Sequence, residues 1–310
     1  MSGAILVTGA TGFVGRAVIA ALADGDRPVV ALVRRFVDDL PAGVIQRRTA
    51  AIETLDQDGW LTALDGIGTV IHLAAIAHIG PDVTDDHYDS VNHRAVAGLG
   101  DAARIAGVKR IVFLSSIRAQ CGPSAPDVQT EASAPRPTDA YGRAKLAGEQ
   151  ALAASDVPYV TLRPVLIVGN APKGNLRLLA RLARLPLPLP LAGLAARRSM
   201  VSLDDVVALT IRAIDDPAMA GQVLILADGA ALTIGEIVAA LRRGSGRAPM
   251  LFALPETLLR LPFRMIGRDD LWQRIGGALV ARSEGLTALG IPAPSGLRAR
   301  LERLLRPPGR

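Results

Sequence analysis

The chain has 310 residues and a formal net charge of +6, from 35 Lys and Arg against 29 Asp and Glu. Half of its residues are hydrophobic but only 3% are aromatic. This length allows one large core or a core with a smaller lobe. The scarcity of aromatic stacking residues argues against a nucleic-acid partner, so an anionic nucleotide or an anionic membrane surface better explains the positive charge. The single cysteine, Cys121, excludes an internal disulfide framework and suits a reducing compartment, and no charged-then-apolar signal segment precedes the first strand. We therefore expect a cytoplasmic protein.

The amino terminus predicts a strand, a glycine-rich turn and a helix. Residues 4–7 are an apolar run suited to a strand buried on both faces of a parallel sheet, and a helical pattern covers 14–23. Between them the spacing is Gly-x-x-Gly-x-x-Gly, which differs from the usual Gly-x-Gly-x-x-Gly. In the dinucleotide-binding arrangement such glycines allow close backbone approach, and the helix N-terminus faces the pyrophosphate. The residues that we expect to bind a dinucleotide here are Gly9, Thr11, Gly12, Phe13, Val14 and Gly15.

A second predicted strand, 29–33, ends in Val33 and is followed by Arg34 and Arg35. A carboxylate at this position binds the ribose hydroxyls of NAD, whereas arginine suits the 2′-phosphate of NADP. We therefore favour NADP over NAD, with two solvated arginines as the alternative.

The middle of the chain supplies two more strands and the residues that follow them. Residues 69–73 predict a strand that contains His72, interpreted as a core histidine, and His78 beyond the strand is assigned to the surface. The next strand, 111–116, delivers two serines, Ser115 and Ser116, at the sheet edge where ligands of α/β proteins bind. Four scattered histidines and one cysteine offer no metal-ligand spacing, so we expect no metal.

Tyr141 and Lys145 lie four residues apart, and helical periodicity places them on one face of a helix. A nearby ammonium favours the phenolate and lowers the pKa of a tyrosine. The pair is therefore a candidate acid/base device for moving a proton on or off a hydroxyl or carbonyl oxygen. A solvated helix face is the competing interpretation.

The last part of the chain changes character after a strand at 159–163. From residue 174 we expect an Arg/Leu helix, which gives way to a Leu-Pro run at 185–190 that proline and arginine prevent from spanning a membrane. A strand at 222–226 is expected to return to the main sheet. Short helices are expected at 255–264, 269–282, 283–289 and 297–305. We interpret them as a packed lid, although the mixture of Arg and Leu would also suit contact with a membrane.

With these motifs in order, the chain resembles the extended short-chain dehydrogenase/reductase family, also called the NAD-dependent epimerase/dehydratase family. Further family-like marks are 72–75, 91–92, 162–164 and 198–205. The resemblance implies an α/β fold: a Rossmann-type doubly wound parallel sheet with a smaller, mainly helical C-terminal substrate lobe. We assign 1–168 and 199–230 to the dinucleotide-binding domain and 169–198 and 231–310 to the lobe, with the substrate between them.

The resemblance also assigns roles to individual residues. Ser116 would hold the reacting oxygen, Tyr141 would exchange its proton, and Lys145 would lower the tyrosine pKa and bind the nicotinamide ribose. Further cofactor-binding residues would be Leu73, Ala74, Ala75, Asn92 and Pro164, with Asn92 at the start of a helix that reaches about residue 106. The family's usual adenine-contacting Asp is replaced around 50–52.

Within the family, residues 115–118, residues 173–175 and the Leu-Pro run that leads to 197–199 make the chain resemble bacterial UDP-4-keto-6-deoxy-N-acetylhexosamine 4-reductases. These enzymes are also called UDP-N-acetylquinovosamine dehydrogenases and serve polysaccharide biosynthesis. In such relatives Asn175 would hold the uridine diphosphate and Arg198 would pair with the diphosphate. Relatives usually have Lys in place of Arg118 and a shorter loop at 120–121.

Three alternatives stay open. A UDP-hexose 4-epimerase with tightly held NAD would use the same Ser, Tyr and Lys. A 4,6-dehydratase needs carboxylates where this chain has Ile117 and Arg118. A redox-sensing cofactor-binding protein would commonly have lost the Tyr or the Lys. The exact sugar, the direction of the reaction and the oligomeric state, a homodimer included, remain undetermined by the sequence.

Overall fold

The computed structural model describes residues 3–77, 83–169, 174–265, 267, 272 and 276–306. The chain divides into two units, each built from three stretches. Unit 1 comprises Met1–Gly122, Ser133–Pro164 and Asp204–Leu224, and unit 2 comprises Pro123–Ala132, Val165–Leu203 and Ile225–Arg310.

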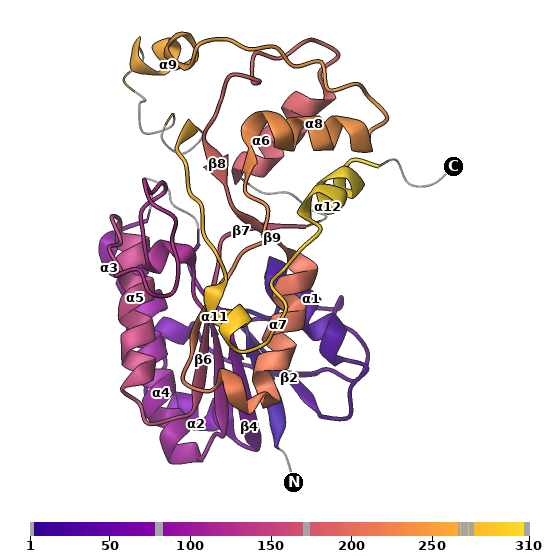
Figure 1. The fold of residues 1–310 in the computed structure, drawn as a ribbon. Coiled ribbons are helices and arrows are strands. Elements are labelled where there is room, and N and C mark those ends of the chain that lie inside the picture. The colour runs from indigo at the N-terminus through magenta and orange to yellow at the C-terminus, as the bar shows by residue number, and fades with distance from the viewer. Residues whose placement is uncertain are drawn as a thin grey trace. The chain divides into compact units, whose positions relative to one another are not determined.

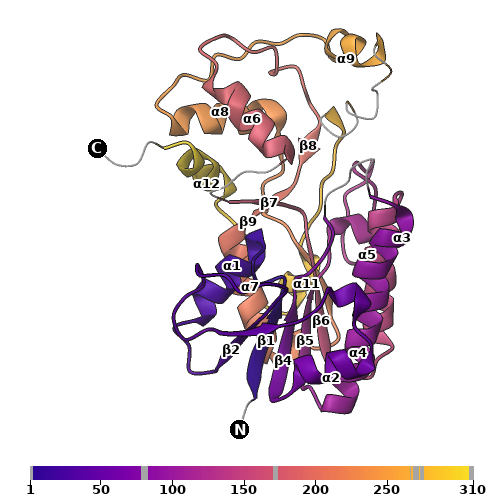
Figure 2. The same cartoon turned by 180° about the vertical axis from the view of Figure 1, so that it is seen from behind.

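Unit 1 is organised around a seven-stranded sheet with the order β10-β6-β5-β4-β1-β2-β3. Figure 2 labels β2, β1, β4, β5 and β6 in this order across the sheet. The strands are β1 (Ala4–Thr8), β2 (Val29–Val33), β3 (Ile45–Arg48), β4 (Ile67–His72), β5 (Arg110–Leu114), β6 (Tyr159–Pro164) and β10 (Val223–Leu226). The pairs from β3 through to β6 are all parallel, and Leu6 of β1 lies in register with Val30 and Val70. The predicted doubly wound parallel sheet is confirmed, including the return of the strand near residue 222 to its edge.

Helices cover both faces of this sheet, which is why its inner strands are continuous apolar runs. Helices α2 (Gln57–Leu64), α4 (Ala95–Ala106) and α5 (Ala140–Ala153) lie on one face, and α1 (Phe13–Leu22) and α7 (Leu203–Asp215) on the other (Figure 1).

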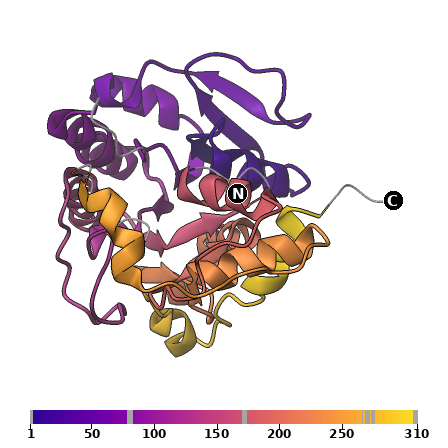
Figure 3. The ribbon, with the colours of Figure 1, turned by 90° about the horizontal axis from the view of Figure 1, so that it is seen from above.

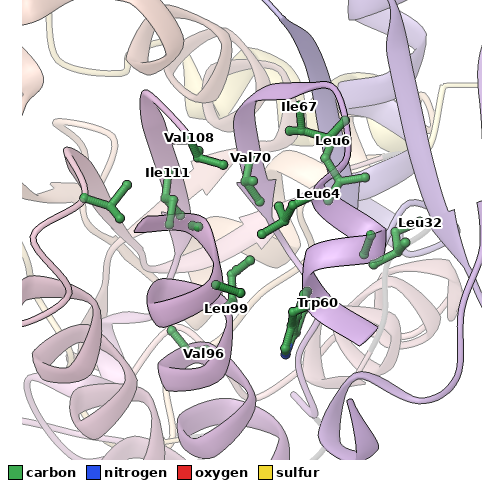
Figure 4. Close-up of a cluster of buried hydrophobic side chains, with 14 of the residues drawn as sticks. Leu6, Leu32, Trp60, Leu64, Ile67, Val70, Val96, Leu99, Val108 and Ile111 are labelled. Atoms are coloured by element: carbon green, nitrogen blue, oxygen red, sulfur yellow. The ribbon is translucent and has the colours of Figure 1, made fainter. Parts of the chain in front are cut away.

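A single apolar cluster joins α2 and α4 to the sheet (Figure 4). Its buried members include Leu6, Val70 and Ile111 from the strands and Trp60, Leu64, Val96 and Leu99 from the helices. Burying each such side chain contributes about 1.5–3 kcal/mol. The cluster therefore holds α2 and α4 against the sheet whose strand ends carry the candidate site.

Asn92 lies inside a widened helical turn and does not begin a helix, so that prediction is wrong. Helix α3 (Asp85–Asp89) runs into a π-helical turn, Ser90–Arg94, before α4 begins at Ala95. The Asn92 side chain accepts a hydrogen bond from Ile76 N and donates one to Ile76 O, each at 3.0 Å. A π turn adds one residue to a helical turn. The two hydrogen bonds between the Asn92 side chain and the backbone of Ile76 stabilise this turn, which helical periodicity in the sequence does not predict.

Unit 2 combines short strand pairs with a group of helices. Strand β7 (Leu166–Val168) pairs with β9 (Met200–Ser202), and β8 (Arg197–Arg198) pairs with β11 (Leu232–Thr233). Helices α6 (Gly174–Arg184), α8 (Ile234–Gly244) and α12 (Leu297–Leu304) share one core that includes Leu176, Val238 and Leu301. Figures 1 and 3 show α12 beside α8. The remaining described helices of this unit are α9 (Glu256–Met265) and α11 (Glu284–Ala288).

The helix expected over 269–282 ends earlier than predicted. Leu279 forms a bridge with Arg198, and Ala281 forms one with Gln129. The backbone of β8 would otherwise have unpaired groups along this edge, and Leu279 satisfies them through bonds with Arg197 O and Ser199 N. Most of 269–275 lies outside the described residues. Among the helices of the described ranges, none is long and apolar enough to cross a membrane.

Candidate active site

The glycine turn after β1 packs so closely that side chains are excluded from it. Gly9 has φ +66°, in the left-handed region that glycine tolerates best. A Cβ on Gly9 would lie 2.7 Å from Ala74 N, and one on Gly15 would lie 2.1 Å from Gly9 O. Helix α1 begins at once, and its N-cap, Gly12, supplies no side-chain cap to the first-turn N–H groups. Uncapped N–H groups at a helix N-terminus bind anions, so this turn fits the diphosphate of a dinucleotide.

A buried threonine holds the end of β1 against the end of β4. Thr8 Oγ1 accepts hydrogen bonds from Leu73 N and Ala74 N, each at 3.2 Å, and lies 3.0 Å from His72 Nδ1. The other ring nitrogen, Nε2, is buried and has no hydrogen-bond partner among the described residues. Burial and then the Lys145 charge lower the pKa of His72 to about 3. His72 is therefore a neutral core histidine, as expected.

The predicted cofactor residues Leu73, Ala74 and Ala75 follow β4 directly and are half-buried beside the glycine turn. Asn92 holds the next residue of this segment, Ile76, through the two bonds described above. Pro164 ends β6 and is buried. All of these residues belong to unit 1. The same unit holds the predicted dinucleotide-binding residues of the glycine turn, of which Thr11 and Gly12 are exposed and Phe13 and Val14 are half-buried.

Arg34 and Arg35 directly follow β2 and are exposed. Among the described residues neither forms an ion pair. The neighbouring acid Asp39 is already paired with Arg16, which lies in the first turn of α1. The end of β2 therefore carries positive charge that no carboxylate of the described chain neutralises.

Ser116, Tyr141 and Lys145 come together at the end of β5 and the start of α5. The Ser116 side chain hydrogen-bonds to Tyr141, and its Oγ also accepts a bond from Arg118 N at 3.2 Å. One helical turn further on, Lys145 Nζ donates to Leu114 O at 2.9 Å and lies 4.7 Å from the centroid of the Phe113 ring. The predicted catalytic residues are thus neighbours in the folded chain.

Close packing at the start of α5 sets this geometry. Asp139 caps the helix through Gly142 N at 2.7 Å and forms an ion pair with Arg118 of the 3₁₀ turn Ile117–Ala119. A Cβ on Gly142 would lie 2.3 Å from Arg118 O, so only glycine allows α5 to approach the turn that carries Ser116. The sequence interpretation missed Asp139, although an Asp just before a helical pattern is a recognisable cap.

Burial raises the pKa of Tyr141 above its ordinary value, the reverse of the sequence expectation. The hydrogen bond from Ser116 and the charge of Arg118 oppose this rise, and Tyr88, whose ring centroid lies 6.0 Å away, adds to it. Burial lowers the pKa of Lys145 to about 8, although the Glu149 carboxylate raises it. Tyr141 accordingly keeps its proton at neutral pH, and Lys145 is mostly an ammonium.

Glu149, one helical turn after Lys145, forms a buried ion pair with Arg163 that the sequence interpretation missed. Arg163 donates to both oxygens of Glu149, with Nη2 to Oε2 at 2.5 Å, and to Gln120 Oε1 at 2.7 Å. Ser115 Oγ donates to the same carboxylate. The available signals were an arginine within an apolar strand and a glutamate four residues after Lys145.

Two of the residues predicted to bind substrate, Asn175 and Arg198, belong to unit 2, whereas the third, Ser116, belongs to unit 1. Asn175 lies in the first turn of α6, and Arg198, in β8, donates from Nη2 to Pro123 O at 3.1 Å. His78 lies outside the described residues. Within the described ranges no group of His, Cys, Asp and Glu could hold a metal ion. Cys121 is buried, and burial raises the pKa of its thiol.

Comparison with known proteins agrees with this geometry. Residues 5–226 match the NAD dependent epimerase/dehydratase family. The chain is 29% identical to UDP-glucose 4-epimerase of Vibrio cholerae over 90% of this chain and 87% of that protein. It is 30% identical to ceramide reductase of Caulobacter vibrioides over 82% of this chain and 74% of that protein. The solved structure of MoeE5 in complex with UDP-glucose and NAD is similar, with a TM-score of 0.75, 27% identity and coverage of 98% of this chain and 97% of that one. The chain is therefore an enzyme of the NAD-dependent epimerase/dehydratase family.

Proposed function

We propose that the enzyme reduces the 4-keto group of a nucleotide sugar, in the manner of a UDP-4-keto-6-deoxy-N-acetylhexosamine 4-reductase. The observation that carries this proposal is the hydrogen bond between Ser116 and Tyr141, with Lys145 one helical turn away. Two hydroxyls that face each other can together hold the oxygen of a carbonyl group between them.

The protonation states of the site favour the reductive direction. A nicotinamide cofactor, when bound, supplies the hydride to the carbonyl carbon. Ser116 orients the carbonyl oxygen, and Tyr141 donates its proton to that oxygen as negative charge develops there. The raised pKa of Tyr141 keeps this proton in place at neutral pH, and the Ser116 hydroxyl and the Arg118 charge, which oppose that rise, stabilise the phenolate that remains.

Replacing Tyr141 with Phe tests this assignment, because it removes the hydroxyl and keeps the ring. General acid catalysis contributes typically about 10²–10⁴-fold, and the loss should appear in kcat as well as kcat/KM because the proton moves in the transition state. Tyr159→Phe, at the start of β6, is the matched control and should keep wild-type rates. Full activity in Tyr141→Phe would contradict the proposed chemistry.

The uncompensated charge of Arg34 and Arg35 supports NADP as the preferred cofactor. Titration followed by nicotinamide fluorescence should show tighter binding of NADPH than of NADH. The Arg34→Ala, Arg35→Ala double variant should lose NADPH affinity, whereas Arg104→Ala, an exposed arginine of α4, should not. Tighter binding of NADH to the wild type would refute the preference.

We place the uridine diphosphate of the substrate on Asn175 and Arg198, the two residues that the family resemblance assigns to it. Calorimetry should detect UDP binding by the wild type. Arg198→Ala should weaken it by about 2–5 kcal/mol, the typical effect of removing a charged partner, and leave NADPH binding intact. An absence of UDP binding would exclude a nucleotide sugar, and the similarity to ceramide reductase would then direct the search to a lipid ketone.

A UDP-hexose 4-epimerase is the second candidate, favoured by the similarity to the Vibrio cholerae epimerase and to MoeE5 bound to UDP-glucose. The stoichiometry separates the two reactions. A reductase oxidises one NADPH per keto sugar, whereas an epimerase converts UDP-glucose or UDP-N-acetylglucosamine without net change in nicotinamide absorbance. Epimer formation without added cofactor would decide for the epimerase.

A further inference from the structure

Helix α6 of unit 2 carries a row of arginines with no acidic residue near them in sequence. Arg177, Arg181 and Arg184 are spaced i, i+4 and i+7, so they share one helix face, and all three are exposed. The stretch from 157 to 203 contains no Asp or Glu. Among the described residues none of the three forms an ion pair. The row is therefore a uniformly positive strip.

Large apolar side chains are exposed on the segment that follows this helix and on residues 250–252, which pair with that segment. Leu187, Met250 and Phe252 are all exposed, Leu187 by 60%. The segment around residue 251 lies beside Leu189, which donates to Met250 O and accepts from Phe252 N, each at 3.0 Å. Residues alternate along the extended stretch around Leu251, which packs on the core of unit 2, so Met250 and Phe252 on either side of it point outward.

A buried arginine holds this backbone in place. The Arg242 guanidinium donates to four carbonyl oxygens, those of Leu185 and Leu187 on one side and of Pro249 and Met250 on the other, at 2.6–3.1 Å. The backbone of Met250 has φ +45°, a conformation that residues other than glycine rarely adopt. Strain of this kind persists where the surrounding structure over-determines it, so the outward display of these side chains is built into the fold.

Helix α9 also exposes large apolar side chains while another of its sides packs on unit 2. Leu259 packs on a cluster with Leu179 and Leu191, which fastens one side of the helix to unit 2. Leu258, Leu261 and Met265, at i, i+3 and i+7, lie on another side and are exposed, Met265 by 79%. A helix that is fastened through one face and apolar on its outward face exposes side chains that water does not favour.

We propose that unit 2 docks on an anionic lipid bilayer through a basic apolar face made of Arg177, Arg181, Arg184, Leu187, Met250 and Phe252, and that the exposed Leu258, Leu261 and Met265 of α9 enter the same bilayer. Arginines attract anionic headgroups while exposed Leu, Met and Phe enter the interface, which is how peripheral amphipathic surfaces bind membranes. A second copy of the chain is a poor partner, because this face against itself would oppose arginine to arginine. Nucleic acid is also a poor partner, because Phe252 is the only aromatic side chain of the face.

Co-sedimentation of the purified full chain with vesicles tests the proposal without any substrate, so its outcome is independent of the proposed function. Vesicles of phosphatidylcholine mixed with phosphatidylglycerol should bind the protein, and vesicles of phosphatidylcholine alone should bind it far less. Each arginine near an anionic surface contributes about fivefold to partitioning. The Arg177→Gln, Arg181→Gln, Arg184→Gln triple variant should therefore bind about 100-fold more weakly.

Two further variants complete the experiment. The charge-matched control, Arg48→Gln, Arg104→Gln, Arg303→Gln, should bind like the wild type, because these exposed arginines lie on other elements. Leu187→Ser with Phe252→Ser should weaken the binding that remains at high salt, where charge attraction is screened. Thermal unfolding and NADPH binding should be unchanged in all variants.

The proposal is overturned if the wild type does not sediment with anionic vesicles, or if the two triple variants bind alike. Equal binding to neutral and anionic vesicles would also overturn it. A dimer in light scattering that the α6 triple variant abolishes would instead make this face a contact between copies.

Discussion

Replacing Glu149 with glutamine should destabilise the protein strongly, although the two side chains have nearly the same shape. The pair is deeply buried, with side-chain exposures of 6% for Arg163 and 5% for Glu149. Glu149 accepts bonds from Arg163 Nε, Arg163 Nη2 and Ser115 Oγ, and Glu149 is the acid that pairs with the arginine charge. Glutamine has one acceptor oxygen, and its amide N–H₂ group would face the donors of Arg163 and Ser115. The Arg163 charge would therefore remain buried without its counter-ion.

Removing one member of a buried ion pair costs about 3–5 kcal/mol. One hydrogen bond of about 1 kcal/mol can be kept by the glutamine oxygen, so we expect a loss of about 3 kcal/mol in the free energy of unfolding, measured with urea. Asp85→Asn, which removes the exposed partner of Arg143, should cost less than about 1 kcal/mol. Replacing both charges, as Glu149→Leu with Arg163→Met, should recover most of the loss because no unpaired charge remains.

The same substitution has a second, kinetic readout. The Glu149 charge raises the pKa of Lys145, so its removal should lower that pKa below about 8. Lys145 then loses its proton at a lower pH, and the alkaline limb of the kcat/KM profile should shift to lower pH. A Glu149→Gln protein as stable as Asp85→Asn, with an unshifted profile, would refute the reasoning.

Three other substitutions test the packing around the site. Because burial lowers the pKa of His72 to about 3, the unfolded chain binds more protons than the folded one below about pH 6.5, and stability should fall there by about 1.4 kcal/mol per pH unit. The free energy of unfolding, measured with urea at several pH values, should fall less steeply with decreasing pH in His72→Asn than in the wild type. An equal dependence on pH in the two proteins would contradict the assignment. Gly15→Ala places a Cβ 2.1 Å from Gly9 O, so it should cost about 1–3 kcal/mol and weaken cofactor binding in a fluorescence titration; wild-type affinity would argue against a tight turn. Gly142→Ala must push α5 away from Arg118 O and should lower kcat more than cofactor affinity. An unchanged kcat would show that the 3₁₀ turn with Arg118 can shift to accommodate the methyl group without moving the catalytic residues.

Local patterns in the sequence were sufficient for most of the sheet and for the choice of the candidate catalytic residues that the structure brings together. Strand β2 agrees with its prediction to the residue, because a short run of five apolar residues, bounded by Pro28 and Arg34 and rich in Val, suits a strand buried on both faces. The glycine turn and the Tyr141–Lys145 spacing are likewise short-range features, whose chemistry follows from the residue types themselves.

Tertiary structure decided the features that depend on residues far apart in the chain. The π turn around Asn92 exists because its side chain bonds to the backbone of Ile76, and the early end of the helix before Leu279 reflects pairing with β8. The direction of the Tyr141 pKa was predicted wrongly because sequence spacing shows a nearby ammonium but not the depth of burial. Glu149 and Arg163 lie on different elements, so only the packing of α5 against β6 makes them a pair. The sequence by itself thus determined which groups are present at the site, and only the fold, by removing water and joining distant segments, decided their protonation and their partners.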